Sequence, residues 1–238
     1  MPEVLIPAAR GSMRAYFAVP AGDEPKPGVV VLHDVGGMTR DHRHQADWLA
    51  EAGFLALAVD LYYKGGILLC LRSVMRDLTN RSGPAFDDVE ACRTWLARQP
   101  NCTGKTGVIG FCMGGGFALL LVSGHGFSAA SVNYGGPLPK DFDDFLQTAC
   151  PVVGSYGGQA KWEQGVAEQL REKLDRALVA NDCLEYPDAG HGFMNNHQHF
   201  FFRLLRWTVI RGPSFGYHER SCMDARRRIA AFFHLHLI

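Results

Sequence analysis

The sequence has no excess of charge of either sign, because 24 Lys and Arg residues balance 24 Asp and Glu residues among its 238 residues. A balanced chain offers no basic surface to nucleic acid or to an anionic membrane, and we expect neither as a partner. The sequence also lacks an apolar run that would span a bilayer, and no basic segment followed by a long apolar stretch opens the chain. We therefore expect a soluble, cytoplasmic protein.

Closely spaced cysteine pairs are absent as well. The seven cysteines are an odd number and form no C-x-x-C pair, which argues against a disulfide framework and against a cysteine zinc site. Histidines do occur in H-x-H pairs, but no spaced set of carboxylates or cysteines accompanies them: His42 with His44, His197 with His199, and His234 with His236. We expect reducing surroundings and no metal site.

The chain does contain a regular alternation of strand and helix patterns. The expected strands cover 14–19, 29–33, 55–60, the segment before Cys112, 129–134, 152–156 and 183–186. The expected helices cover 41–52, a segment opened by Asp87 and Asp88, 166–177, and a last helix that begins at Ser221 with Asp224 completing a capping box. This alternation predicts one α/β domain over residues 1–238, with a doubly wound, mostly parallel sheet flanked by helices.

Two stretches fit this alternation poorly, residues 63–84 and residues 195–218. Long irregular segments in an α/β domain often cover an active site. We expect these two to be irregular and to lie over the site as lids, with ordinary packing of their aromatic side chains as the alternative.

Cys112 is the candidate nucleophile. It lies in Thr106-Gly-Val-Ile-Gly-Phe-Cys-Met-Gly-Gly-Gly116, where an apolar strand ends in glycines and a helix-prone segment follows. This is the G-x-nucleophile-x-G strand-turn-helix pattern with a thiol in place of serine. The turn directs the side chain outward at the positive end of a helix, which favours a thiolate. The alternative is a buried cysteine without chemistry, as we expect for the other six.

His191 is the candidate base. It lies in the glycine-flanked loop Tyr186-Pro-Asp-Ala-Gly-His-Gly-Phe-Met-Asn195, directly after the last expected strand. Imidazole is the usual base near neutral pH, and in folds with this nucleophile turn the histidine comes last in the chain. A structural hydrogen bond in a loop is the alternative.

Acyl transfer also needs hydrogen-bond donors for a developing oxyanion. One donor in this pattern is the amide after the nucleophile, here Met113. The other comes from the loop after an early strand, here Leu32-His-Asp-Val-Gly-Gly37, for which we select the amide of Val35. The alternative is that the glycine pair serves only as a turn.

Together these residues resemble the dienelactone hydrolases (carboxymethylenebutenolidases), cysteine-dependent members of the α/β-hydrolase fold. The resemblance spans nearly the whole chain. Its segments are Leu32-His-Asp-Val-Gly-Gly37, Asp60-Leu-Tyr62, Gly110-Phe-Cys-Met-Gly-Gly115, Asn133-Tyr-Gly135, Ser155-Tyr-Gly-Gly158, Ala189-Gly-His-Gly-Phe-Met194 and the ending from Asp224 to His236. The cysteine motif combined with Ala-Gly-His-Gly-Phe is the specific part.

The resemblance implies hydrolysis of a small ester or lactone without a metal or an organic cofactor. Cys112 would attack the carbonyl, the amides of Val35 and Met113 would hold the oxyanion, and His191 would move protons. Asp34 matches an acidic position that, in the family, interacts with the resting thiol and gates its activation. A cap on its own loop is the alternative role for Asp34.

One position departs from the family pattern. Where the family carries its triad acid, this chain reads Gly157-Gly-Gln-Ala160-Lys161, and Ala160 cannot orient an imidazole. Glu163 from the same loop is our preferred substitute acid, and a solvated charge at a helix start is its alternative role. Asp188 lies near His191 in sequence but would need an awkward fold-back to reach its ring.

Three explanations of the alanine at position 160 stay open. Another carboxylate replaces the missing acid, the chain was altered at this position, or the lineage no longer hydrolyses anything. We expect an ester or lactone hydrolase whose activity is reduced if no carboxylate replaces the missing one. The alternative is a weakened family member that acts as a ligand-binding or regulatory module. The natural substrate and the oligomeric state are not predicted.

Overall fold

The computed structural model describes residues 3–196 and 214–238. Its sheet has the strand order β1-β2-β4-β3-β5-β6-β7-β8. The strands are β1 (Glu3–Ala8), β2 (Gly11–Ala18), β3 (Lys26–Leu32), β4 (Leu55–Val59), β5 (Cys102–Phe111), β6 (Ala129–Asn133), β7 (Val152–Gly157) and β8 (Asn181–Tyr186). The helices are α1 (Arg40–Glu51), α2 (Gly66–Asn80), α3 (Pro84–Ala97), α4 (Met113–Leu120), the 3-10 helix η1 (Phe142–Thr148), α5 (Val166–Arg176) and α7 (Glu219–Leu237).

Most of the sheet is parallel. The strands from β4 through β3, β5, β6 and β7 to β8 pair in parallel, while β2 pairs antiparallel with both β1 and β4. The central strands β3, β4 and β6 are mostly apolar and are buried along nearly their whole length, as a sheet covered on both faces requires. The parallel pairing aligns the carboxyl ends of β3, β5, β6, β7 and β8 along one edge of the sheet.

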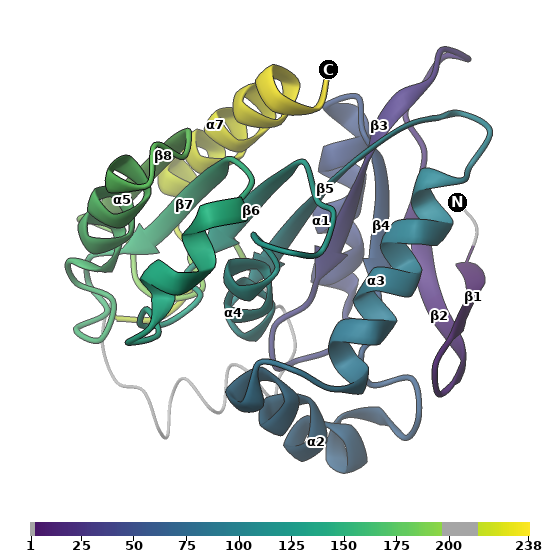
Figure 1. Cartoon of the computed structure of the whole chain (residues 1–238), viewed down its shortest axis with the longest axis horizontal. Helices are drawn as coiled ribbons and strands as arrows, with labels where there is room; N and C mark the ends of the chain where they lie inside the picture. Colours follow the sequence, from purple (N-terminus) through teal and green to yellow (C-terminus); the bar gives the residue numbers. More distant parts are fainter. Residues whose placement is uncertain (1–2, 197–213) are drawn as a thin grey trace.

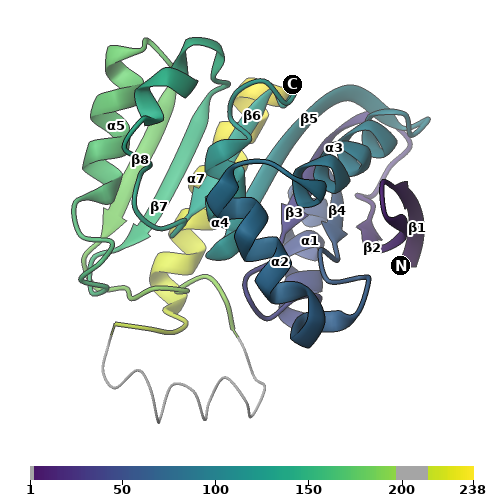
Figure 2. The same ribbon diagram turned by 60° about the horizontal axis from the view of Figure 1, so that its bottom comes forward.

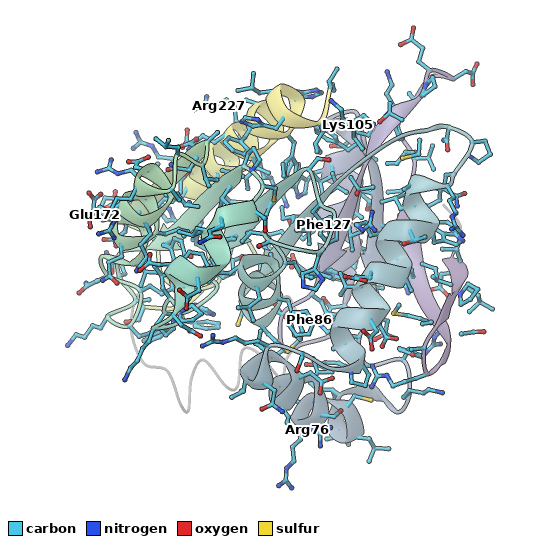
Figure 3. The ribbon with its side chains drawn as sticks, in the orientation of Figure 1. Arg76, Phe86, Lys105, Phe127, Glu172 and Arg227 are labelled. Carbon is cyan, nitrogen blue, oxygen red and sulfur yellow. The ribbon has the colours of Figure 1, made fainter. Side chains whose placement is uncertain are left out.

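Helices cover both faces of the sheet (Figures 1 and 2). Helices α1 and α7 pack on one face, and α3, α4 and α5 pack on the other, with α2 against α3 and α4. Each face buries its own apolar cluster. In Figure 3 the side chains of Phe86 and Phe127 lie inside the molecule, whereas those of Arg76, Glu172 and Arg227 project outward.

The doubly wound α/β fold expected from the sequence is confirmed, but two helix starts were wrong. Helix α3 begins at Pro84, because proline suits the first helical turn. Helix α7 begins at Glu219 with the extended residue His218 as its N-cap, so Ser221 does not cap it. The Ser221 hydroxyl is instead paired with Nδ1 of His218, and Asp224 accepts a hydrogen bond from Tyr186.

The two stretches expected to be irregular have different outcomes. Residues 63–84 contain α2, a helix that the sequence analysis did not predict. Of residues 195–218, those from 197 to 213 lie outside the described part of the chain. No helix within the described ranges has the length and apolar character to cross a membrane.

Candidate active site

Cys112 lies at the turn between β5 and α4. It is the N-cap residue of α4 and has φ 55° and ψ −114°, a backbone conformation that side-chain-bearing residues rarely adopt. Its amide donates to the carbonyl of Asn133 at 3.1 Å, which ties the turn to the end of β6. A strained residue between strand and helix is the geometry that exposes a nucleophile in this motif. The Cys112 side chain is half-buried.

The glycines around Cys112 are required by close backbone approach. A Cβ on Gly110 would lie 1.9 Å from the carbonyl oxygen of Gly114, and a Cβ on Gly114 would lie 2.4 Å from that of Leu32. A Cβ on Gly115 would lie 2.5 Å from the carbonyl oxygen of Asn133. Since all three contacts are with backbone, no side-chain rotation can relieve them.

This packing predicts the stability of two alanine variants in α4. We expect Gly114→Ala to lower the free energy of unfolding by about 3 kcal/mol or more, because the turn must move away from β3. Gly116→Ala is the matched control, because its nearest contacts are 3.3 Å and include a leucine side chain that can shift. Urea denaturation measures both, and equal midpoints for the two variants would contradict the packing argument.

The structure pairs His191 with Glu163. Nδ1 of His191 is hydrogen-bonded to Oε1 of Glu163, and Oε2 of Glu163 accepts from the amide of Gly157 at 3.1 Å. Glu163 is fully buried and His191 is 7% exposed. Both carboxylate oxygens are thus occupied, which fixes the ring and leaves Nε2 of His191 as the nitrogen that faces Cys112.

The loops that carry Glu163 and His191 are joined by backbone hydrogen bonds. The amide of Gly158 donates to the carbonyl of Tyr186 at 2.9 Å, and the amide of Gln159 donates to that of Ala189 at 2.9 Å. A Cβ on Gly157 would lie 2.4 Å from the carbonyl oxygen of Gly190, so a glycine is needed for the loops to meet. The sequence therefore places an acid and a histidine together through paired loops after β7 and β8.

Aromatic rings surround the His191 imidazole. Ring centroids lie 5.2 Å away for Tyr134, 5.1 Å for Phe215 and 5.8 Å for Trp162. Tyr134 is fully buried and its hydroxyl donates to Asn195 at 2.5 Å. The sequence pattern predicted no role for these rings, although Tyr134 belongs to the Asn-Tyr-Gly segment of the resemblance. Trp162 is 51% exposed, so this group of rings reaches the solvent on one side.

The surroundings of His191 favour its charged form. Burial by itself lowers the pKa of His191, but hydrogen bonds to Cys112 and Glu163 outweigh it and raise the pKa to about 10. The imidazolium therefore persists through neutral pH in the resting protein.

This pKa predicts an NMR titration. We expect the His191 imidazole to keep the NMR chemical shifts of its charged form up to about pH 10. In Glu163→Gln the imidazole is expected to lose its proton at a lower pH, because one of the two groups that raise its pKa is gone. Glu168→Gln, on the exposed side of α5, is the control and should leave the His191 titration unchanged. Identical titrations of Glu163→Gln and the wild type would contradict the pairing.

The two candidate oxyanion donors have free amides. Within residues 3–196 and 214–238, the N–H groups of Val35 and Met113 donate to no protein acceptor. The groups around Val35 are occupied, since the amide of Gly36 donates to Oδ1 of Asp34 at 2.6 Å and that of Gly37 donates to the Asp34 carbonyl at 3.2 Å. Both free amides follow strands that end at the same sheet edge as Cys112.

The remaining candidates are placed as follows. Ala160 is fully buried, and its carbonyl accepts from the amide of Glu163 at 2.8 Å. Asp34 is 7% exposed and makes the loop-capping hydrogen bond to Gly36. Asp188 is exposed. No group of three or more potential metal ligands occurs in the described residues, which do not include His197 and His199.

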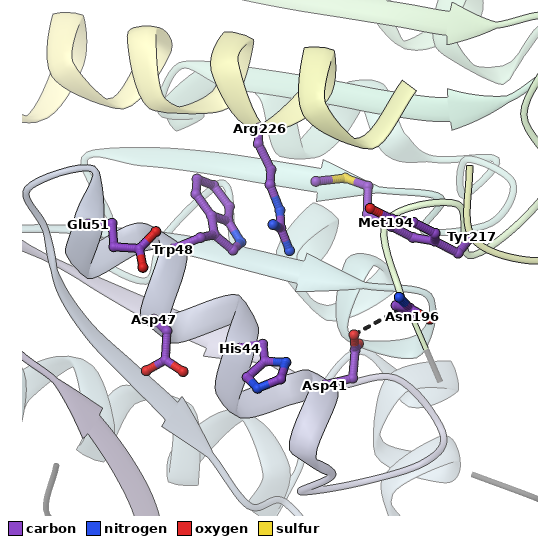
Figure 4. Close-up of a pocket in the computed structure, with 9 residues that line it drawn as sticks. All are labelled: Asp41, His44, Asp47, Trp48, Glu51, Met194, Asn196, Tyr217 and Arg226. Atoms are coloured by element: carbon purple, nitrogen blue, oxygen red, sulfur yellow. Dashed lines mark hydrogen bonds between the residues drawn. The ribbon is translucent and has the colours of Figure 1, made fainter. Parts of the chain in front are cut away.

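A separate pocket of about 340 Å³ lies between α1 and α7 (Figure 4). Its lining residues are Asp41, His44, Asp47, Trp48, Glu51, Met194, Asn196, Tyr217 and Arg226. Asp41 accepts hydrogen bonds from the side chain of Asn195 at 2.7 Å and from the amide of Asn196 at 2.9 Å. Asp41 thus anchors the loop that continues from His191, which gives this carboxylate a structural role.

A strained cysteine at a strand-helix turn, a histidine from the last loop and a buried carboxylate define an α/β hydrolase. A family model described as the dienelactone hydrolase family matches residues 13–237. The chain belongs to the dienelactone hydrolase family and is a hydrolase.

Individual relatives agree with this family. A protein from Salmonella typhimurium is 28% identical over 244 residues, covering 96% of this chain and 84% of its own. A carboxymethylenebutenolidase from Pseudomonas putida is 28% identical over 181 residues, covering 71% and 75%. A solved structure from Klebsiella pneumoniae, assigned as a dienelactone hydrolase, has a TM-score of 0.76 at 26% identity and covers 98% of this chain and 97% of its own.

Proposed function

We propose that the protein hydrolyses small esters or lactones by acyl transfer to Cys112. The observation that carries this proposal is the hydrogen bond between the buried carboxylate of Glu163 and Nδ1 of His191. In this proposal Glu163 supplies the acid that Ala160 cannot supply, at the edge of the sheet where Cys112 lies. The nucleophile, the base and the orienting carboxylate then come from the loops after β5, β8 and β7.

The reaction follows from these positions. The sulfur of Cys112 attacks the carbonyl carbon, and the negative charge that develops on oxygen is held by the amides of Val35 and Met113. The carbon-oxygen bond to the leaving group then breaks, and Nε2 of His191 gives its proton to the departing alkoxide. A water molecule attacks the thioester, His191 accepts its proton, and the acid leaves as the thiolate re-forms.

Glu163 and Asp34 have separate parts in this proposal. Glu163 keeps the imidazole oriented and stabilises its charge, as a triad carboxylate does, without taking its proton. Asp34 is proposed to gate the resting thiol from its place beside the oxyanion loop, in addition to capping that loop. Ala160 leaves room for the glutamate to reach His191 from three positions further along the chain.

The substrate class is inferred from the family. The Pseudomonas putida relative is named a carboxymethylenebutenolidase, and we extend lactone hydrolysis to this chain on that basis. None of the proposed steps requires a metal or an organic cofactor. The seven cysteines are all unpaired, which supports our proposal that the protein works in the reducing cytoplasm.

Turnover of simple substrates tests the proposal. We expect the purified protein to hydrolyse 4-nitrophenyl acetate and small unsaturated lactones over many turnovers, at an unchanged rate in the presence of a chelator. The absence of hydrolysis of all of these substrates would contradict it.

The same experiment separates the hydrolase from a binding or regulatory module. That alternative rests on a missing carboxylate, and the hydrogen bond between Glu163 and His191 supports the hydrolase instead. A single stoichiometric acylation of Cys112 without release would favour the module, whereas a linear steady state favours the hydrolase.

A further inference from the structure

This inference rests on the proposed function and concerns the loop that supplies the Val35 amide. Two peptide groups flank Val35, and the direction of its N–H depends on how both are held. The first peptide group joins Asp34 to Val35, and the second joins Val35 to Gly36. Two side chains hold these peptide groups, that of His33 at the start of the loop and that of Tyr62 after β4.

His33 holds the first peptide group. Its Nε2 accepts from the amide of Leu61 at 3.1 Å, so the ring proton must lie on Nδ1. Nδ1 then donates to the carbonyl of Asp34 at 2.6 Å. A trans peptide points its C=O and its N–H in opposite directions, so fixing the Asp34 carbonyl fixes the Val35 N–H on the other side.

The state of His33 suits this role. The ring is 1% exposed, and burial lowers the pKa of His33, so the ring stays neutral and keeps one donor and one acceptor. Because Leu61 follows β4, this histidine connects the ends of β3 and β4 as well as the loop between β3 and α1. Its orientation is therefore set from a neighbouring strand.

Tyr62 holds the second peptide group. Its hydroxyl donates to the carbonyl of Val35 at 3.3 Å and lies 3.5 Å from Sδ of Met113, so it contacts both residues whose amides are the proposed donors. Burial raises the pKa of Tyr62, which keeps the hydroxyl protonated and able to donate. A Cβ on Gly37 would lie 2.8 Å from the Tyr62 ring, so the ring packs directly under the loop.

We propose that His33 and Tyr62 are positioning residues that aim the Val35 amide at the oxyanion. His33 fixes the peptide before Val35, and Tyr62 fixes the peptide after it. The Gly36 and Gly37 amides are occupied, whereas the N–H of Val35 donates to no acceptor in the described part of the chain and can meet a substrate. Neither side chain needs to touch the substrate.

The test compares two neighbouring tyrosines. Tyr62→Phe removes the hydroxyl contact to Val35, and Tyr63→Phe is the matched control, because its hydroxyl donates to Asp88 at 3.2 Å, away from the loop. For 4-nitrophenyl acetate we expect Tyr62→Phe to lower kcat about tenfold, a part of what the loss of a whole oxyanion donor causes, with KM changed less than twofold. Tyr63→Phe should keep the wild-type kcat.

A second readout separates aiming of the amide from general damage. Iodoacetamide alkylates a thiolate without forming an oxyanion, so its reaction rate at Cys112 should be the same in wild type and Tyr62→Phe. Equal kcat values for Tyr62→Phe and Tyr63→Phe would overturn the inference. So would a parallel fall of kcat and alkylation in Tyr62→Phe, since that reports a damaged thiol.

His33 is tested by rescue. His33→Leu should lose kcat, whereas His33→Gln should recover most of it, because an amide offers one donor for Asp34 and one acceptor for Leu61. Tyr62→Phe still decides the outcome if His33→Leu does not fold. A wild-type protein that hydrolyses no ester contradicts the proposed function and this inference with it. An active wild type with unchanged Tyr62→Phe contradicts this inference alone.

Discussion

Glu163→Gln is expected to lower kcat for ester hydrolysis by about 10²- to 10⁴-fold, with a smaller change in KM. The upper figure is the cost of neutralising the triad carboxylate in serine enzymes, and a cysteine enzyme loses less because its thiol is more acidic. Gln cannot stabilise the charged imidazole, so the charged form of His191 becomes less favourable. Steady-state kinetics on 4-nitrophenyl acetate measure the effect.

Two further variants show whether the carboxylate itself matters. Glu168→Gln removes an exposed charge from α5 and should leave kcat unchanged. Ala160→Asp combined with Glu163→Gln returns a carboxylate to the position that carries the acid in the family, and we expect it to recover at least part of kcat. A Glu163→Gln variant with wild-type kcat would mean that Glu163 only fills space.

Cys112→Ala is expected to reduce hydrolysis to the uncatalysed rate, because no other group in the proposed reaction forms the bond to the acyl carbon. Cys112→Ser should retain a small fraction of kcat, since a hydroxyl is a much weaker nucleophile than a thiol near neutral pH. Stopped-flow mixing with 4-nitrophenyl acetate should show no burst for Cys112→Ala.

Cys183→Ala is the control for this substitution. Cys183 lies in β8, and burial raises the pKa of its thiol to about 12, so it is not expected to react near neutral pH. Its replacement should leave kcat unchanged. Substantial hydrolysis by Cys112→Ala would contradict the proposed mechanism, in which Cys112 is the nucleophile.

Much of the architecture was predictable because parallel strands leave a strong pattern. The runs at 29–33 and 55–60 are buried on both faces, and the two strands observed there differ from these expected ranges by a few residues at most. β1 was missed because it is an edge strand with only Ile6 buried. Helix α2 was missed because Leu68 and Leu69 are 94% and 77% exposed, so its apolar residues do not follow the face that packs.

The site was predictable where one motif carries the geometry, and less so where two loops must meet. The strained turn at Cys112 follows from glycines that touch the backbone of neighbouring segments. The choice of Glu163 over Asp188 depended on the path of the loop after β7, which the pairing of Gln159 with Ala189 determines. A contact between separate loops has no periodic signal in sequence. The predicted start of α7 was wrong for a local reason. The residue before the helix, His218, is extended and has no capping signature in the sequence.

The central claim is that an acyl group passes through Cys112 under the control of His191 and Glu163. Rapid acid quench after mixing with 4-nitrophenyl acetate, followed by peptide mass spectrometry, tests it most directly. The account predicts one acetyl group, on Cys112, which forms fast in the wild type and is lost by hydrolysis within the time of one turnover. Acetylation of another residue, or hydrolysis without any acetylated Cys112, would contradict it.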